Sequence, residues 1–114
     1  MLAEVQADPT RIVFPRLDWE DPGTWATHKG GIGCTLGFLW HPLSEHEIPE
    51  QQKDASARGG SATASRPSPV LFGAVFSVQR AFFLRLGGFD PEFGFGGSGE
   101  NVELSFRAWL CGGS

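Results

Sequence analysis

Apolar positions along the chain gather in short runs that predict alternating strands and helices. Residues 2–10 predict the end of a helix stopped by Pro9, and the run of Ile12, Val13 and Phe14 then predicts a short buried strand. Residues 33–40 alternate loosely between apolar and polar side chains, which favours a second strand. Residues 71–78 are apolar nearly throughout, so we expect a third strand that is central and buried on both faces.

A helix is predicted to follow this third strand and to begin at Ser77 or Val78. Three of its side chains are expected to pack inward, namely Phe82, Phe83 and Leu86. Gly87 and Gly88 then supply its stop, because glycine readily adopts the left-handed conformation in which helices commonly end.

The last helix is predicted to run from about Ser98 to Cys111 and to end at Gly112. Its core-facing stripe follows the i, i+4, i+7 spacing and consists of Val102, Phe106 and Trp109 or Leu110. Glu103 and Arg107 stand one helical turn apart, so we expect a local ion pair that contributes about 0.3–0.5 kcal/mol.

Between the second and third strands, residues 50–66 are rich in Gly, Ser, Ala and charged side chains. Such a segment buries too little apolar surface to offset the entropy of ordering it, so we expect a mobile loop.

The composition fits one piece of globular protein of 114 residues. An apolar content of 40% with 10 Phe and 4 Trp is ample for a core, whereas the net charge of -4 argues against a nucleic-acid partner. No apolar run reaches the ~18 residues of a membrane span, and the first residues lack the cationic start and apolar centre of a signal sequence. We therefore expect one domain or part of one, with no membrane segment and no targeting segment in this chain.

A glycine-rich turn directly precedes the last helix and is suited to a polar ligand. It contains Gly94, Gly96, Gly97 and Gly99. These positions permit close approach of the backbone to a ligand, and the start of the helix offers unpaired amide donors. Glu100 and Asn101 stand where a phosphate site would carry a lysine and a hydroxyl, so we expect a hydroxyl-rich ligand such as a sugar.

Other interpretations of this turn compete with a sugar site. Gly94, Gly96 and Gly99 match the spacing of a dinucleotide fingerprint, but the preceding FDPEF is no buried strand and no acidic ribose partner follows. A phosphate loop is excluded because an acidic and an amide side chain replace its Lys and its Ser or Thr. A linker that binds nothing, capped by Ser98 at the helix start, stays open.

Two segments contain side chains of the kinds that bind metal ions. Asp18 and Asp21 offer carboxylates suited to a hard cation. The second group is formed by His41, Glu45, His46 and Glu47. Pro42 and the polar setting favour a solvated loop for the second group, whereas a metal site and a turn both stay open for the two aspartates.

Two further pairs of residues leave alternatives open. Cys34 and Cys111 are too far apart in sequence for a recognisable zinc pair, so a disulfide and free thiols both remain. Phe38 and Trp40 occupy alternate positions of the second strand and are expected to present their rings on one face. Core packing and an aromatic binding surface are equally compatible with that pair.

Four segments follow the motifs of one family in the same order. LGGFDPEF and GENVELSFRAWLCGG together resemble the pattern LGxYDxxMxxWGGENxELSFRxWxCGG. PRLDWEDPGTW resembles P-x-I-D-x-I-D-x-x-T-F, GFLWHPL resembles N-F-x-W-x-P-x, and SPVLFGAVFSV resembles T-P-x-x-A-G-G-L-F-x-I. These patterns are those of the polypeptide N-acetylgalactosaminyltransferases, so the chain resembles this family over nearly its whole length.

The resemblance implies a fold and a reaction. The fold is an α/β A-type glycosyltransferase (nucleotide-diphospho-sugar transferase) fold, of which this chain would form an incomplete mixed sheet with flanking helices. The reaction is transfer of N-acetylgalactosamine (GalNAc) from UDP-GalNAc to Ser or Thr of acceptor proteins, with retention at the anomeric carbon. The family also implies manganese as cofactor, mucin-type O-glycosylation and the Golgi apparatus.

The same resemblance assigns roles to individual residues. Glu100 and Asn101 match the E-N pair that binds the sugar hydroxyls. The positions implied to lie at the donor sugar are Phe72, Gly73, Ala74, Phe95, Gly96 and Gly97. Phe38 and Trp40 match an aromatic pair that lines the acceptor-peptide groove, where flat rings suit Pro-rich segments. Cys111 matches a cysteine whose disulfide partner would lie outside this chain, which leaves a free thiol as the alternative here.

The chain also departs from the family pattern. By resemblance, Met1 falls just after the metal-binding Asp-x-His motif and Ser114 falls before a later histidine ligand. The resemblance also places Asp18 and Asp21 downstream of that motif, so we favour a turn and cap role for them and predict no metal site in this chain. We therefore expect a central fragment of the catalytic domain, inactive alone, with neither metal ligands nor a lectin domain. Phe72, Ala74 and the Ser98–Gly99 spacing differ from A-G-G and W-G-G, so we expect low or altered transferase activity even for the full-length parent protein. The alternative is a catalytically inactive, truncated relative that retains peptide or sugar binding.

Overall fold

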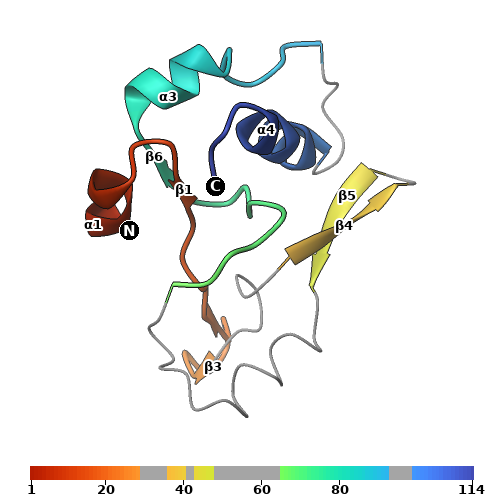
Figure 1. The fold of residues 1–114 in the computed structure, drawn as a ribbon. Helices are drawn as coiled ribbons and strands as arrows, with labels where there is room; N and C mark the ends of the chain where they lie inside the picture. Colours follow the sequence, from red (N-terminus) through yellow and green to blue (C-terminus); the bar gives the residue numbers. More distant parts are fainter. Residues whose placement is uncertain (29–35, 41–42, 48–64, 93–98) are drawn as a thin grey trace.

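A computed structural model describes residues 1–28, 36–40, 43–47, 65–92 and 99–114 (Figure 1). Its elements are, in order, α1 (Leu2–Ala7), β1 (Ile12–Val13), β2 (Trp19–Glu20), β3 (Thr27–His28), β4 (Leu36–Trp40), β5 (Leu43–Glu47), β6 (Ser77–Val78), α3 (Arg80–Arg85) and α4 (Gly99–Leu110). None of the helices in these ranges is long and apolar enough to cross a bilayer.

The described strands form three antiparallel pairs, β1 with β6, β2 with β3, and β4 with β5. On the other side of β1, the Ile12 N–H donates to the Ser114 carbonyl at 2.7 Å and the Ser114 N–H donates to the Thr10 carbonyl at 3.3 Å. One residue that bonds in this way to two residues of its neighbour makes a parallel pairing. The C-terminal end therefore lies beside β1 (Figure 1), and the arrangement around β1 is mixed.

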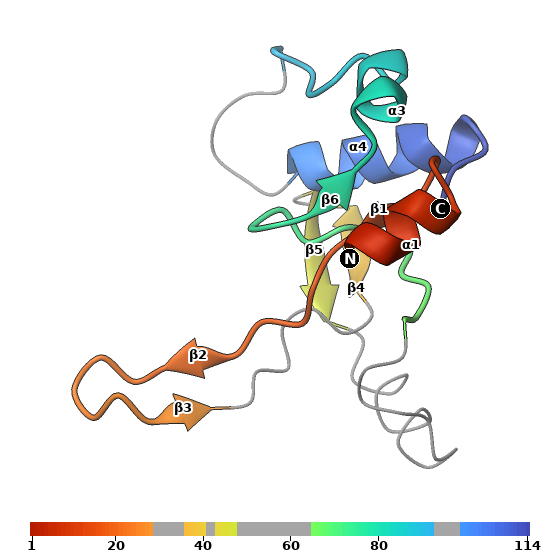
Figure 2. The same ribbon diagram turned by 90° about the vertical axis from the view of Figure 1, so that its left-hand side faces the viewer.

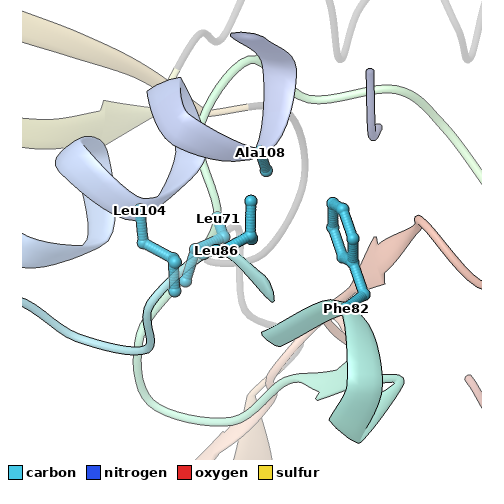
Figure 3. Close-up of a cluster of buried hydrophobic side chains, with 5 residues drawn as sticks. All are labelled: Leu71, Phe82, Leu86, Leu104 and Ala108. Atoms are coloured by element: carbon cyan, nitrogen blue, oxygen red, sulfur yellow. The ribbon is translucent and has the colours of Figure 1, made fainter. Parts of the chain in front are cut away.

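Helix α4 is central because it contributes to both clusters of buried side chains. The first cluster joins α3 to α4 and consists of Leu71, Phe82, Leu86, Leu104 and Ala108 (Figure 3). The second joins β4 to α4 and consists of Leu36, Val70 and Val102, with Phe14, Phe38, Phe72 and Phe106 packed against it. Each fully buried side chain of this size contributes roughly 1.5–3 kcal/mol by leaving water, so α4 fixes the surrounding elements in place.

Several predicted boundaries are confirmed. Helix α1 ends at Asp8, directly before Pro9, because a residue that precedes proline is disfavoured in the helical conformation. Helix α3 is followed by Gly87 and Gly88, whose φ angles of 93° and 70° require glycine. Helix α4 is followed by Gly112 at φ 76°, and the predicted second strand is present as β4.

The predicted central strand over residues 71–78 is wrong. Only Ser77 and Val78 pair, with β1, while residues 73–74 form a turn that leaves Ala74 and Val75 exposed. A short apolar run does not by itself distinguish a strand from a segment whose side chains pack one by one against a helix. Because β6 occupies Ser77 and Val78, helix α3 begins at Arg80 instead of at those residues.

The predicted apolar stripe of the last helix is confirmed at Val102 and Phe106 but is wrong at its C-terminal end. Leu110 is 86% exposed, and Trp109 lies at the surface with its indole N–H donating to the Pro69 carbonyl at 3.1 Å. The buried positions of α4 are Gly99, Asn101, Val102, Leu104, Ser105 and Ala108. Because α4 packs between two clusters, its inward face includes small and polar residues that an apolar pattern overlooks.

The solvated loop predicted beside Pro42 is also wrong for residues 43–47, which form β5 and pair with β4. The backbone of β4 needs a hydrogen-bonding neighbour, and that need overrides the polar composition of LSEHE. His41 and Pro42 lie outside the described residues, as does all of the predicted mobile loop except positions 65 and 66.

Candidate functional site

The first turn of α4 and the turn at residues 72–74 lie against each other. Asn101 is only 6% exposed, and its amide fills the space beside the backbone of Gly73. A Cβ atom on Gly73 would stand 2.5 Å from Asn101 Cγ and still closer to both terminal amide atoms. Glu100, one position earlier, is partly exposed. Two segments that the sequence assigned to one sugar site are therefore in direct contact.

The Ser105 hydroxyl links these two segments through hydrogen bonds. Its hydroxyl donates to the Asn101 carbonyl at 2.6 Å and accepts from the Leu71 N–H at 3.0 Å. Ser105 is buried, so both bonds are shielded from water. Sequence reasoning missed this residue, although a serine inside a helix can be expected to bond the carbonyl four positions earlier.

The remaining positions assigned to the donor sugar are only partly described. Phe72 packs against the cluster of Leu36, Val70 and Val102, which accommodates its ring within the protein. Ala74 is exposed. The predicted positions Phe95, Gly96 and Gly97 lie outside the described residues, as does Ser98.

The predicted aromatic pair shares one face. The ring centroids of Phe38 and Trp40 lie 4.9 Å apart in an edge-to-face arrangement. Phe106 of α4 joins them, with its centroid 4.9 Å from Phe38 and 6.1 Å from Trp40. Trp40 is 76% exposed, whereas Phe38 and Phe106 pack against the core. One ring of the predicted pair, Trp40, is therefore exposed, whereas the other, Phe38, packs against the core.

Asp21 has the turn role that the sequence favoured. Its Oδ1 accepts from the N–H groups of Gly23 and Thr24, each at 2.8 Å. The bond from Thr24, followed by that from Gly23, lowers the pKa of the Asp21 carboxyl below its ordinary value because both stabilise the ionised form. Across the part of the chain that the structure describes, no three His, Cys, Asp or Glu side chains are grouped to hold a metal ion.

Arg107 forms the predicted ion pair with Glu103 and also donates to two backbone carbonyls. It bonds both carboxylate oxygens of Glu103, with Nη2 2.6 Å from Oε2. It also donates to the carbonyls of Leu86 and Gly88, the latter at 2.7 Å. Arg107 therefore links the C-terminal end of α3 to α4. Cys111 is an exposed free thiol within the described ranges, and Cys34 lies outside them.

Comparisons with known proteins agree with the motif resemblance. No protein-family model matches the chain. Over its whole length, the chain is 35% identical to polypeptide N-acetylgalactosaminyltransferase 5 of Caenorhabditis elegans. It is 37% identical to polypeptide N-acetylgalactosaminyltransferase 15 of Mus musculus and 36% identical to polypeptide N-acetylgalactosaminyltransferase 14 of Homo sapiens. The chain spans only 18%, 17% and 20% of these relatives, respectively.

The fold gives the same result. A crystal structure of GalNAc-T7 with UDP, GalNAc and Mn2+ matches 97% of this chain with a TM-score of 0.65 and 28% sequence identity. The match covers 21% of that protein, so the predicted partial glycosyltransferase fold is confirmed. The chain is a divergent member of the polypeptide N-acetylgalactosaminyltransferase family.

Proposed function

We propose that this chain forms the part of a polypeptide GalNAc-transferase in which the sugar of UDP-GalNAc meets a Ser- or Thr-containing peptide. The proposal rests on one observation, which is that α4 contacts both the turn at Gly73 and the aromatic pair. Asn101 contacts the turn at Gly73, and Phe106 contacts the aromatic pair Phe38 and Trp40. These two residues are five positions apart, or about 7.5 Å along a helix axis, which suits two substrates that must react with each other.

The proposed chemistry is a group transfer at the anomeric carbon of the sugar. The Ser or Thr hydroxyl oxygen forms a bond to that carbon, and the bond to UDP breaks with its electron pair leaving on the diphosphate. The hydroxyl proton passes to the departing phosphate oxygen. The Glu100 carboxylate, partly exposed on the first turn of α4, accepts hydrogen bonds from sugar hydroxyls. Phe38 and Trp40 hold the peptide through their apolar rings.

Manganese accompanies UDP and GalNAc in the GalNAc-T7 structure. The described residues of this chain do not form a ligand set for it, so we assign no step to the metal. We place the activity in mucin-type O-glycosylation in the Golgi on the strength of the family relationship alone.

A binding protein without turnover is the second candidate. The departure at Ala74 favours it, because added side-chain volume beside a donor site weakens binding, whereas the Phe72 ring packs within the protein. The comparisons do not favour it, since all three named relatives are transferases.

The test incubates the chain with UDP-GalNAc, manganese and a Thr-containing, Pro-rich peptide, and measures donor binding by calorimetry and glycopeptide by mass spectrometry. We expect the parent chain to bind UDP-GalNAc. We expect Glu100→Gln to lower this affinity about tenfold, which is the loss typical of removing one hydrogen bond to a charged group. Glu92→Gln, an exposed acidic residue outside the site, is the matched control and should bind normally. Because the chain alone is expected to be inactive, transfer is measured with the chain in place of the corresponding segment of an active family member. There, binding without glycopeptide would support the second candidate, and absence of donor binding would contradict both.

A further inference from the structure

We infer that Asn101 is a positioning residue, which holds the turn at Gly73 in place, and that Glu100 alone of the two faces the sugar. The inference deepens the proposed function, on which its sugar-binding part rests. It also changes the role of Asn101 that the family resemblance implied, from a sugar ligand to a support.

The burial of Asn101 carries the first step. A side chain that is 6% exposed and pressed against Gly73 has little surface left for a ligand. Neighbouring residues of an α-helix point about 100° apart around its axis. Glu100 is therefore turned away from the direction that Asn101 takes, and its partial exposure agrees with a position open to a ligand.

Gly73 supplies the second step. Its hydrogen occupies the place where any other residue would carry Cβ, and a Cβ there would overlap the whole amide group of Asn101. Any other residue at this position would force the buried Asn101 side chain to move, independently of any bound donor. A glycine that a motif comparison assigns to ligand contact is explained here by contact with Asn101.

The third step concerns Ser105, whose hydroxyl gives the segment at Leu71 a second attachment to α4. One turn after Asn101, its hydroxyl joins the Asn101 carbonyl to the Leu71 N–H. The turn that follows Leu71 is therefore anchored to α4 at two points, the Ser105 hydroxyl and the Asn101 amide. Such a two-point attachment fixes the distance between this turn and Glu100.

A melting-temperature cycle tests the positioning role without any ligand. We expect Gly73→Ala to lower the melting temperature by about 5 °C or more through overpacking, and Asn101→Ala to lower it through loss of packing. The double variant should melt above Gly73→Ala, because the added methyl group occupies the space that the amide leaves. Additive shifts in the double variant would overturn the inference.

A control variant shows whether the coupling is specific to Gly73 and Asn101. Gly23→Ala, in the β2–β3 turn, should combine additively with Asn101→Ala, because Gly23 contacts Asp21 instead. If Gly73→Ala alone fails to fold, a cooperative transition in the double variant supports the inference. Failure of the double variant to fold, while Asn101→Ala folds, would overturn it.

Titration with free N-acetylgalactosamine, followed by saturation-transfer NMR, tests the sugar-binding part. We expect binding to fall about tenfold or more in Gly73→Ala and to recover in the Gly73→Ala/Asn101→Ala double variant. Glu100→Gln should lose binding while keeping the melting temperature of the parent chain. A folded double variant that does not recover binding would show that Asn101 itself contacts the sugar. If the parent chain does not bind the sugar, the proposed function fails, whereas the melting cycle still decides the role of Asn101.

Discussion

Ser105 shows how one hydroxyl joins segments that lie 34 residues apart in the chain. The N–H of Leu71 is buried and belongs to no helix or strand, so a side chain has to satisfy it. Asp21 does comparable work at the surface, where one carboxylate oxygen satisfies two turn amides. At the scale of single residues, short polar side chains thus replace the backbone pairing that the irregular segments lack.

Removal of the Ser105 hydroxyl should destabilise the chain clearly. We expect Ser105→Ala to lower the free energy of unfolding by about 1–3 kcal/mol, because the buried Leu71 N–H loses its acceptor. Urea unfolding followed by circular dichroism measures the change. Ser65→Ala, at an exposed position, is the control and should change stability by less than about 0.5 kcal/mol. A similarly small loss in Ser105→Ala would contradict the bridging role.

The Asp21 turn should be sensitive to acid. Because the pKa of Asp21 is lowered in the folded chain, its ionised form stabilises the turn above the pKa of the unfolded chain, near ~3.9. This stabilisation is lost as the pH falls through the lower folded-state value. We expect the Gly23 and Thr24 amide signals in NMR spectra to move together with a midpoint below ~3.9.

Asp21→Asn is the matched control for this titration. The asparagine keeps an oxygen that accepts from both amides but removes the ionisable group, so the turn should persist and its amide signals should not titrate in acid. A midpoint at or above the ordinary value of an aspartate would contradict the lowered pKa.

At the scale of elements, α4 is the part to which the others attach. Its inward face packs on α3 and on β4, and Arg107 bonds the two carbonyls that follow α3. The carbonyls at the end of a helix have no partners within it, and a cation there also interacts favourably with the helix dipole. The packing of α3 against α4 therefore depends on charge as well as on apolar contact.

The guanidinium geometry of Arg107 should be necessary for this attachment. Lysine keeps the charge but cannot bond Glu103 in a bidentate manner while also reaching both carbonyls. We expect Arg107→Lys to lower the free energy of unfolding by about 1–2 kcal/mol, measured by urea unfolding. Arg80→Lys, at an exposed position of α3, is the control and should have little effect. Equal stability of the two variants would show that only the charge matters.

The success of sequence-based prediction also differs between elements. The ends of α1, α3 and α4 follow from local proline and glycine chemistry, which a single stretch of sequence contains. The strand β5 pairs with β4, which directly precedes it, but its polar composition does not indicate a strand. The strand β6 forms with β1, a partner far along the chain, and no local pattern contains that information. The contact between Gly73 and Asn101 is of the same kind. Motif resemblance placed both residues at one site, but only the fold shows that they touch.

At the scale of the whole molecule, the two most exposed aromatic side chains among the described residues lie at places of different character. Trp40 lies beside Phe38 and Phe106 and is supported by the core. Trp25 lies in the turn of the β2–β3 hairpin, which extends away from the rest of the chain (Figure 2), and it has a positive φ of 57°. The two rings are 76% and 75% exposed, so they form a matched pair for testing which surface binds a peptide.

We expect Trp40→Ala to weaken binding of a Pro-rich, Thr-containing peptide by tenfold or more, a loss typical of a central aromatic contact. Trp25→Ala should bind the peptide like the parent chain, because Trp25 lies in the β2–β3 turn and outside the proposed peptide site. NMR titration measures both affinities. Equal losses in the two variants would contradict a peptide site at Trp40, and the high exposure of both rings makes unfolding an improbable cause.

The shared dependence on α4 has an evolutionary consequence. A helix that supports a glycine turn on one side and an aromatic face on the other transmits any tilt or shift to both. Substitutions near Gly73 and near Phe38 should therefore show epistasis, although the two positions are far apart in sequence. Lineages that altered donor preference would be expected to retain compensating changes in acceptor preference, inherited as a set.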